Sequence, residues 1–245
     1  MLEICSFSLE SCLTAQKAGA GRIELCGGML EGGTTPSVGL IRLARQHLNI
    51  QLYVMIRPRG GDFCYSATEF EVMKADILTV KSLNVDGVVF GILNPNGSVD
   101  KIRTTELANL AAPLKVTFHR AFDVTENPFQ ALEDIITCGC ERILTSGQKN
   151  TAIKGLDLLE ILVQKSNNRI EIMAGSGITT QNAQQFLSIG IHALHMTGKG
   201  IQESKMTFRK LDVSMASSSL SNEYEIYEAD FEKCKAVAEQ VSFKE

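Results

Sequence analysis

Short apolar runs with strand composition alternate along the chain with longer segments in which apolar residues recur at helical spacing. The predicted strands are Leu2–Ser6, Arg22–Leu25, Leu52–Ile56, Gly87–Phe90, Lys115–His119, Arg142–Leu144, Arg169–Met173 and Ala193–Met196. Each is followed by a predicted helix, in order Leu9–Ala18, Ser37–His47, Ala67–Ser82, Thr104–Ala111, Pro128–Cys138, Ala152–Lys165, Gln181–Ser188 and Phe231–Ser242. Because parallel strands need crossover helices, this repeat favours an α/β fold, a TIM (β/α)8 barrel, over a doubly wound sheet.

One stretch interrupts this rhythm between the last predicted strand and the last predicted helix. Residues Gly200–Glu228 carry no sustained strand or helix pattern, and Ser217, Ser218 and Ser219 lie among them. We predict an irregular excursion there, whose polarity allows it to be mobile. The chain as a whole, residues 1–245, is predicted to form a single barrel domain.

Alternation within the predicted strands separates residues that face the outer helices from residues that face the barrel interior. The helix-facing positions are apolar, as at Ile4 and Ile23. The inward positions are unusually polar, and buried charges need partners, so Glu3, Arg22 and Glu171 fit a satisfied ion network as well as they fit a site. Inward residues at the C-terminal ends of strands are better functional candidates, since barrel active sites lie at that face. The predicted inward residues are Glu3, Cys5, Arg22, Glu24, Cys26, Arg57, Thr117, His119, Glu171 and His195.

The segment Met55–Phe63 runs from an apolar strand into two arginines that flank a proline. Pro58 fixes its own backbone and pushes Arg57 toward an extended conformation. A guanidinium fork suits carboxylates and phosphates, and burial of Arg57 without a compensating charge is costly. We therefore expect Arg57 to meet either an inward carboxylate or an anionic ligand, with Arg59 beside it.

Composition excludes several classes of protein. A net charge of −4 and the lack of a basic run argue against a nucleic-acid partner. No apolar run approaches the roughly 20 residues of a membrane span, and the first residues lack the features of a signal peptide. The seven cysteines are dispersed and odd in number, which fits reduced thiols better than a disulfide framework. We expect a cytoplasmic protein with no membrane partner.

Several motifs of the chain resemble those of the CutC family. They are Arg22–Cys26, Glu31–Ser37, Met55–Ser66, Thr117–Asp123, Leu144–Gly147 and Ala174–Gly177. The resemblance runs from Met1 to about Thr197, and it implies a TIM barrel with an assignment to copper homeostasis. At Thr197–Lys199 the chain departs from the serine-containing loop of the family.

The copper hypothesis rests on two thiols. Cys5 and Cys26 fall at the ends of adjacent predicted strands and both face inward, where two soft ligands could hold Cu(I). Both match cysteines of the family pattern, and Cys64, in the loop after the third strand, is a candidate third ligand. The alternative is that inward cysteines near a barrel mouth are compact apolar fillers. The remaining cysteines, Cys12, Cys138, Cys140 and Cys234, are predicted to be structural.

The competing hypothesis is an enzyme that acts on a small phosphorylated or carboxylated molecule at the same mouth, without a metal. His119 could serve as general acid or base there, and Glu24 could orient it or abstract a proton itself. Glycine turns follow the seventh and eighth predicted strands, where many barrels bind phosphate on backbone N–H groups. The candidate catalytic residues are Glu24, His119, Asp123 and His195, and the candidate ligand-binding residues are Arg57, Arg59, Arg120, Ser146, Gly175, Ser176 and Gly177.

A third hypothesis makes the chain a binding module for another protein, which would need an exposed apolar patch. We also expect a homo-oligomer, with a dimer as the first guess, because barrels commonly pair. The expected partners are thus a copper ion or a small anionic molecule, together with further copies of the chain.

Overall fold

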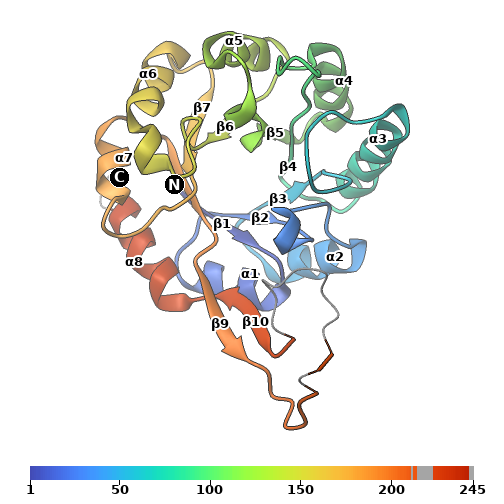
Figure 1. Cartoon of the computed structure of the whole chain (residues 1–245), viewed down its shortest axis with the longest axis vertical. Coiled ribbons are helices and arrows are strands. Elements are labelled where there is room, and N and C mark those ends of the chain that lie inside the picture. The colour runs from blue at the N-terminus through green and yellow to red at the C-terminus, as the bar shows by residue number, and fades with distance from the viewer. Residues whose placement is uncertain (211, 214–222, 243–245) are drawn as a thin grey trace.

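The computed structural model describes residues 1–210, 212–213 and 223–242, and at its centre parallel strands form a closed barrel. The strands follow one another around the barrel in chain order, and the last pairs with the first (Figure 1). The predicted TIM barrel is confirmed. The strands are β1 (Leu2–Ser6), β2 (Arg22–Leu25), β3 (Gln51–Met55), β4 (Gly87–Phe90), β5 (Lys115–Phe118), β6 (Arg142–Thr145), β7 (Glu171–Gly175) and β8 (Ala193–Met196).

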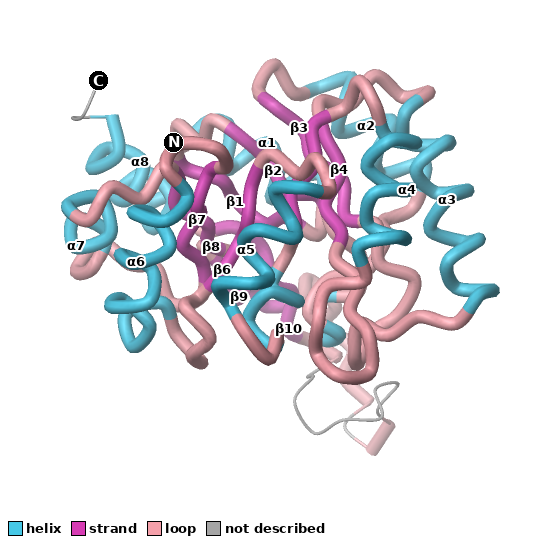
Figure 2. Tube along the Cα trace, turned by 90° about the horizontal axis from the view of Figure 1, so that it is seen from above, coloured by secondary structure: helices cyan, strands magenta, loops and turns pink. Residues whose placement is uncertain are grey.

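Helices lie around the barrel and form its outer layer (Figure 2). They are α1 (Leu9–Lys17), α2 (Val38–His47), α3 (Ala67–Lys81), α4 (Lys101–Ala111), α5 (Pro128–Thr137), α6 (Leu156–Ser166), α7 (Ala183–Ser188) and α8 (Phe231–Ser242). Short 3₁₀ helices precede three of them, namely η1 (Met29–Glu31), η2 (Arg120–Val124) and η3 (Ala152–Gly155). Among the described residues, no helix has both the length and the apolar character needed to cross a membrane.

Polar side chains determine where several helices begin. Ser66 caps α3 and exchanges hydrogen bonds with Glu69 in a capping box. The side chain of Asp100 accepts a hydrogen bond from the backbone N–H of Arg103, so α4 begins one turn earlier than the pattern predicted. Caps of this kind fix the lengths of the loops that follow the strands.

The main apolar core lies between the barrel and its helices, where Ile4 and Ile23 are fully buried. Inside the barrel, Glu3 and Arg22 are buried together, as predicted. Glu171 fits the predicted ion network, but the burial expected for it is wrong, because β7 begins at this residue and 48% of its side chain is exposed at the strand's N-terminal edge. It pairs there with Arg142, whose Nη2 lies 2.5 Å from the carboxylate.

The segment predicted as irregular, Gly200–Glu228, has a strand at each end instead. Strands β9 (Lys199–Glu203) and β10 (Glu225–Ala229) form an antiparallel two-stranded sheet outside the barrel, at the bottom of Figure 1. Backbone pairing with a second strand thus supplies order that a polar sequence does not reveal. The expectation for Ser217, Ser218 and Ser219 lies outside the described residues.

Candidate functional site

The C-terminal ends of the barrel strands surround a cavity of about 1160 Å³, at the face where TIM-barrel active sites lie. Loops after β1, β2, β3, β5, β7 and β8 line it, and α8 contributes one side. The predicted site residues in the lining are Cys5, Glu24, Arg57, His119, Arg120, Asp123, Ser176, Gly177 and His195. The predicted residues outside the described lining are Cys26, Arg59, Cys64, Ser146 and Gly175.

Cys5 and Glu24 line one side of this cavity and Cys26 is buried next to them, and we call these three residues the thiol wall. Cys5 pairs in register with Glu24, so Cys26, two residues further along the chain, points the same way. The Sγ atoms of the two cysteines lie 3.7 Å apart, and Sγ of Cys26 lies 3.6 Å from Oε2 of Glu24. Two thiolates that share one metal ion at a tetrahedral angle, with bonds of about 2.3 Å, lie about 3.8 Å apart. The cysteine pair therefore already has the spacing of two thiolates on one tetrahedral metal ion.

A buried ion network lies next to the thiol wall, deeper in the barrel. Strand register places Glu3 beside both Arg22 and His195. Glu3 accepts a hydrogen bond from Nε of Arg22, and its other oxygen lies 2.6 Å from Nδ1 of His195. Burial would raise the pKa of Glu3, but the charges and hydrogen bonds of Arg22 and His195 lower it to about 2. This carboxylate orients His195 so that its Nε2 lies 3.8 Å from Glu24.

Mutual contacts set the protonation of the thiol wall. Hydrogen bonding with Cys26, and next the hydrogen bond and charge of His195, lower the pKa of Cys5 to about 6 against the effect of burial. The same contact with Cys5, together with burial, raises the pKa of Cys26. Burial raises the pKa of Glu24 well above its usual value. Of the two thiols, Cys5 is therefore the one that loses its proton more readily.

Arg57, just after β3, is only 5% exposed. Its Nη1 donates to the carbonyl oxygens of Glu31 and Gly33 at 2.7 and 2.8 Å, and its Nη2 donates to that of Gly61 at 2.9 Å. The guanidinium thus ties the loop after β2 to the loop after β3. Its Nε is buried without a hydrogen-bond partner. No carboxylate oxygen among the described residues lies within 4.0 Å of it, so the predicted inward carboxylate is missing there.

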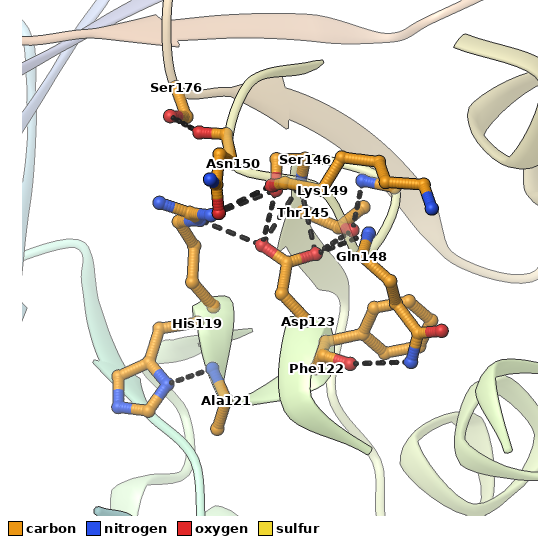
Figure 3. Close-up of polar contacts among 12 residues, drawn as sticks. His119, Ala121, Phe122, Asp123, Thr145, Ser146, Gln148, Lys149, Asn150 and Ser176 are labelled. Carbon is orange, nitrogen blue, oxygen red and sulfur yellow. Dashed lines mark hydrogen bonds and ion pairs between the residues drawn. The ribbon is translucent and has the colours of Figure 1, made fainter. Parts of the chain in front are cut away.

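His119 joins β5 to η2, a helix that the sequence pattern did not predict. Its Nδ1 accepts a hydrogen bond from the backbone N–H of Ala121 at 3.2 Å (Figure 3). Burial, followed by the charge of Arg57, lowers the pKa of His119 to about 3, so the ring is neutral. A neutral imidazole that accepts through Nδ1 carries its proton on Nε2. That Nε2 is buried without a partner, which leaves His119 with one unused donor.

Asp123 is the centre of a contrasting set of contacts, which we call the Asp123 network (Figure 3). Its carboxylate accepts hydrogen bonds from Nε of Arg120 at 2.7 Å and from the hydroxyl of Thr145 at 2.5 Å. Ser146 donates through its N–H at 3.0 Å and its hydroxyl at 2.9 Å, and the N–H of Gln148 donates at 3.1 Å. The carboxylate therefore joins the loop after β5 to the loop after β6. This saturation favours a structural role over the catalytic one predicted.

The loop after β7 was predicted to hold an anion on its backbone. Ser176 has a φ of 79° and Gly177 a φ of 75°, in the left-handed region that non-glycine residues rarely adopt. Within the described residues the N–H groups of Gly177 and Ile178 donate no hydrogen bond, and both residues line the cavity. Gly175 has a packing role, since a Cβ there would lie 2.6 Å from Leu144. Part of this loop can thus receive a ligand, while Gly175 serves the barrel.

Arg59 and Cys64 lie apart from the groups that converge on the thiol wall. Arg59 donates to Glu69 at 2.5 Å and to Asp62 at 3.0 Å, so nearby carboxylates already compensate its charge. Cys64 belongs to neither set of converging ligand atoms found among the described residues. The structure therefore does not bring these two candidates together with Cys5 and Cys26.

Comparison with known proteins places the chain in a family. The model of the CutC family matches residues 1–200. The chain belongs to the CutC family. A copper homeostasis protein cutC homolog of Mus musculus is 45% identical over 238 residues, which cover 97% of this chain and 88% of the relative. A CutC family protein of Citrobacter koseri is 45% identical over 230 residues, which cover 94% of this chain and 92% of the relative.

Solved structures agree with this assignment. A CutC structure from Streptococcus agalactiae is similar with a TM-score of 0.77 and 37% identity, covering 80% of this chain and 98% of that one. Phosphoribosyl anthranilate isomerase of Thermus thermophilus has a TM-score of 0.59 at 12% identity, covering 100% of this chain and 99% of that one. The second likeness shows the barrel fold alone. The resemblance to the CutC family is therefore confirmed.

The interior of this CutC barrel also holds two residues that were not predicted to face inward, Tyr53 and Arg142. The guanidinium of Arg22 lies 4.8 Å from the centre of the Tyr53 ring, and that of Arg142 lies 5.3 Å from it. Strand alternation was the available signal, because Tyr53 is two residues from Met55 and Arg142 precedes the helix-facing Ile143. An aromatic ring between two cations stabilises the deep part of the barrel below the site.

Proposed function

We propose that this CutC chain takes part in copper homeostasis by binding one Cu(I) ion between Cys5 and Cys26. The observation that carries the proposal is the 3.7 Å separation of their Sγ atoms, at a place where Cys5 lines the cavity. Cu(I) prefers soft thiolate ligands to carboxylates. Curated relatives that cover nearly the whole chain are named copper homeostasis proteins, which supports copper as the cargo.

The position of the two thiols favours entry of the ion from the cavity. Cys5 lines the cavity, whereas Cys26 is fully buried behind it. An ion that enters from the cavity would therefore bind Cys5 first, and Cys26 would then complete its coordination. Glu24 and His195 are harder donors nearby and would suit Zn(II) better than Cu(I), so Zn(II) is the competing cargo.

An anaerobic Cu(I) titration against a competing chelator tests this proposal. We expect binding of one ion per chain in the parent and a loss of at least about 100-fold in affinity in both Cys5→Ser and Cys26→Ser, since removing a ligand costs more than removing its outer partners. Cys64→Ser is the matched control and should bind as the parent does. Equal Cu(I) binding in the parent and both site variants, or tighter binding of Zn(II) than of Cu(I), would overturn the proposal.

We also propose that the chain works in the cytoplasm and as a homo-oligomer. The seven cysteines are all free, which suits a reducing compartment. Ile201 on β9 and Phe208 beyond it are 61% and 72% exposed, and large exposed apolar side chains suit a contact between copies. Light scattering should give a dimer or larger mass for the parent and a smaller one for Ile201→Ser. A monomeric parent would contradict the assembly.

A further inference from the structure

Arg57 carries a buried positive charge whose neighbours are all neutral. Three of its five N–H groups donate to carbonyl oxygens, and no carboxylate oxygen in the described part of the chain lies within 4.0 Å. The hydroxyl of Tyr65 interacts with Arg57 but does not compensate its charge, because burial raises the pKa of this hydroxyl to about 12 and keeps it neutral. A buried guanidinium without an opposite charge is costly. Arg57 therefore has the charge and the free donors to receive an anion.

A second unused donor lies close to Arg57. Nε2 of His119 and Nε of Arg57 are both buried without a hydrogen-bond partner. The centre of the Phe63 ring lies 4.9 Å from the His119 ring and 5.1 Å from Cζ of Arg57. All three residues line the cavity. Two N–H donors and one uncompensated charge thus gather on the β3–β5 side of the mouth.

We propose that the cavity binds a small organic anion whose acid group, a carboxylate or a phosphate, accepts hydrogen bonds from Nε of Arg57 and Nε2 of His119. Both groups are strong acceptors that a guanidinium recognises. The cavity of about 1160 Å³ leaves room for the rest of a metabolite-sized molecule. Oε1 of Glu24, a residue of the lining, is a further buried atom without a hydrogen-bond partner. A hydroxyl or amino group of the ligand would donate the missing hydrogen bond to it.

The donors that recognise the acid group are independent of the copper proposal. Its donors follow β3 and β5, whereas Cys5 and Cys26 end β1 and β2. The charge that recognises the acid group belongs to Arg57, which no thiol contacts within hydrogen-bonding distance among the described residues. The double variant Cys5→Ser with Cys26→Ser should therefore lose Cu(I) and keep the anion.

The test uses inorganic phosphate and malonate as probes, with sodium chloride at matched ionic strength as the reference. His119→Asn is the informative variant, because the Asn oxygen can replace Nδ1 as acceptor for Ala121 while Nε2–H is lost. His192→Asn is the matched control, since Nδ1 of His192 accepts the N–H of Ile172 in the same way at 3.1 Å and His192 is outside the described cavity lining. Thermal unfolding and ¹⁵N-edited spectra of the histidine rings report binding.

We expect at least one probe to raise the Tm of the parent and of His192→Asn and to shift the Nε2 resonance of His119. Affinity should fall at least about tenfold in His119→Asn, as for a lost hydrogen bond to a charged group. A response to phosphate alone identifies a phosphate group, and a response to malonate alone identifies a carboxylate. No response in the parent, an equal response in His119→Asn, or loss of the response in the double cysteine variant would overturn the proposal.

Discussion

The Asp123 network and the thiol wall lie at the same mouth, yet they differ in how far their hydrogen-bonding capacity is used. The carboxylate of Asp123 is filled by donors from its own loops. By contrast, Oε1 of Glu24 in the thiol wall, and Nε of Arg57 and Nε2 of His119 after β3 and β5, are buried without partners. Buried polar atoms are nearly always satisfied, so exceptions in a cavity wall mark where a ligand gains most. The number of hydrogen bonds already made within the protein therefore distinguishes residues that hold loops together from residues of the same chemical type that are available to a ligand.

The largest effect on stability is expected at Glu3, which supports the thiol wall from within the barrel. Glu3→Gln leaves Arg22 buried without its carboxylate, and it removes the partner of His195. Breaking a buried ion pair costs about 3–5 kcal/mol, which urea denaturation at pH 7 should show as a loss in the free energy of unfolding. The exposed Glu10→Gln on α1 is the control. An equally small change in both variants would mean that the network does not stabilise the barrel.

The pH dependence of the same variant provides a second readout. The pKa of Glu3 falls from 4.5 to about 2 on folding, so the unfolded chain binds the proton more readily. Its stabilisation is complete above about pH 4.5 and is lost as pH falls toward 2. The difference in unfolding free energy between parent and Glu3→Gln should therefore narrow over that range. A constant difference from pH 6 to pH 2 would contradict the assignment.

The next largest effect is expected in the Asp123 network. Asp123→Asn replaces one acceptor oxygen by an NH₂ donor. This donor would face the hydroxyl of Thr145 and the N–H and hydroxyl of Ser146, which are donors themselves. We expect a loss of about 2–4 kcal/mol in the free energy of unfolding, as for several unsatisfied buried hydrogen-bonding groups. Cu(I) affinity should stay unchanged. Asp157→Asn, at an exposed position on α6, is the control. If Asp123→Asn instead weakens Cu(I) binding and keeps the stability of the parent, Asp123 serves binding and not the structure of the loops.

An effect that appears only in acid solution is expected from the buried neutral ring of His119. Its pKa falls from 6.5 to about 3 on folding, so the unfolded chain takes up a proton first as the solution is acidified. The contribution is complete above about pH 6.5 and is lost at about 1.4 kcal/mol per pH unit toward pH 3. His119→Asn should lack this slope in urea denaturation series, whereas His192→Asn should keep it. Identical slopes in the parent and His119→Asn would show that the ring is not buried in its neutral form.

Alternation along strands predicted the thiol wall because the period of a strand is a local property. Cys5, Glu24 and Cys26 were placed on one side of the barrel from sequence, and the register of β1 and β2 brings them there. The same reasoning missed the exposure of Glu171, since a strand that begins two residues later leaves its first side chain at an exposed edge. Periodicity gives the facing of a residue but not the depth at which its strand begins.

The partners of Arg57 and Asp123 could not be read from the sequence for a different reason. Arg57 binds backbone carbonyls of Glu31 and Gly33, and every residue type carries a carbonyl, so no pattern announces these acceptors. The carboxylate of Asp123, after β5, accepts hydrogen bonds from groups that follow β6. Its hydrogen bond with Thr145 depends on the conformation of both loops. Charge and strand position therefore predicted that these residues lie at the mouth, while their roles required the loops in three dimensions.

The smallest effect is expected at Arg59, which was predicted as an anion clamp beside Arg57. Its side chain is 35% exposed and pairs with Glu69 and Asp62, so solvent screens the pair and its charge is already compensated. Arg59→Gln should leave the urea midpoint within experimental error of the parent, and phosphate or malonate should bind it as they bind the parent. If Arg59→Gln instead weakens either probe as much as His119→Asn does, the anion site extends to the outer loop after β3. An ion pair between an arginine and nearby carboxylates would then not show that the arginine is unavailable to a ligand.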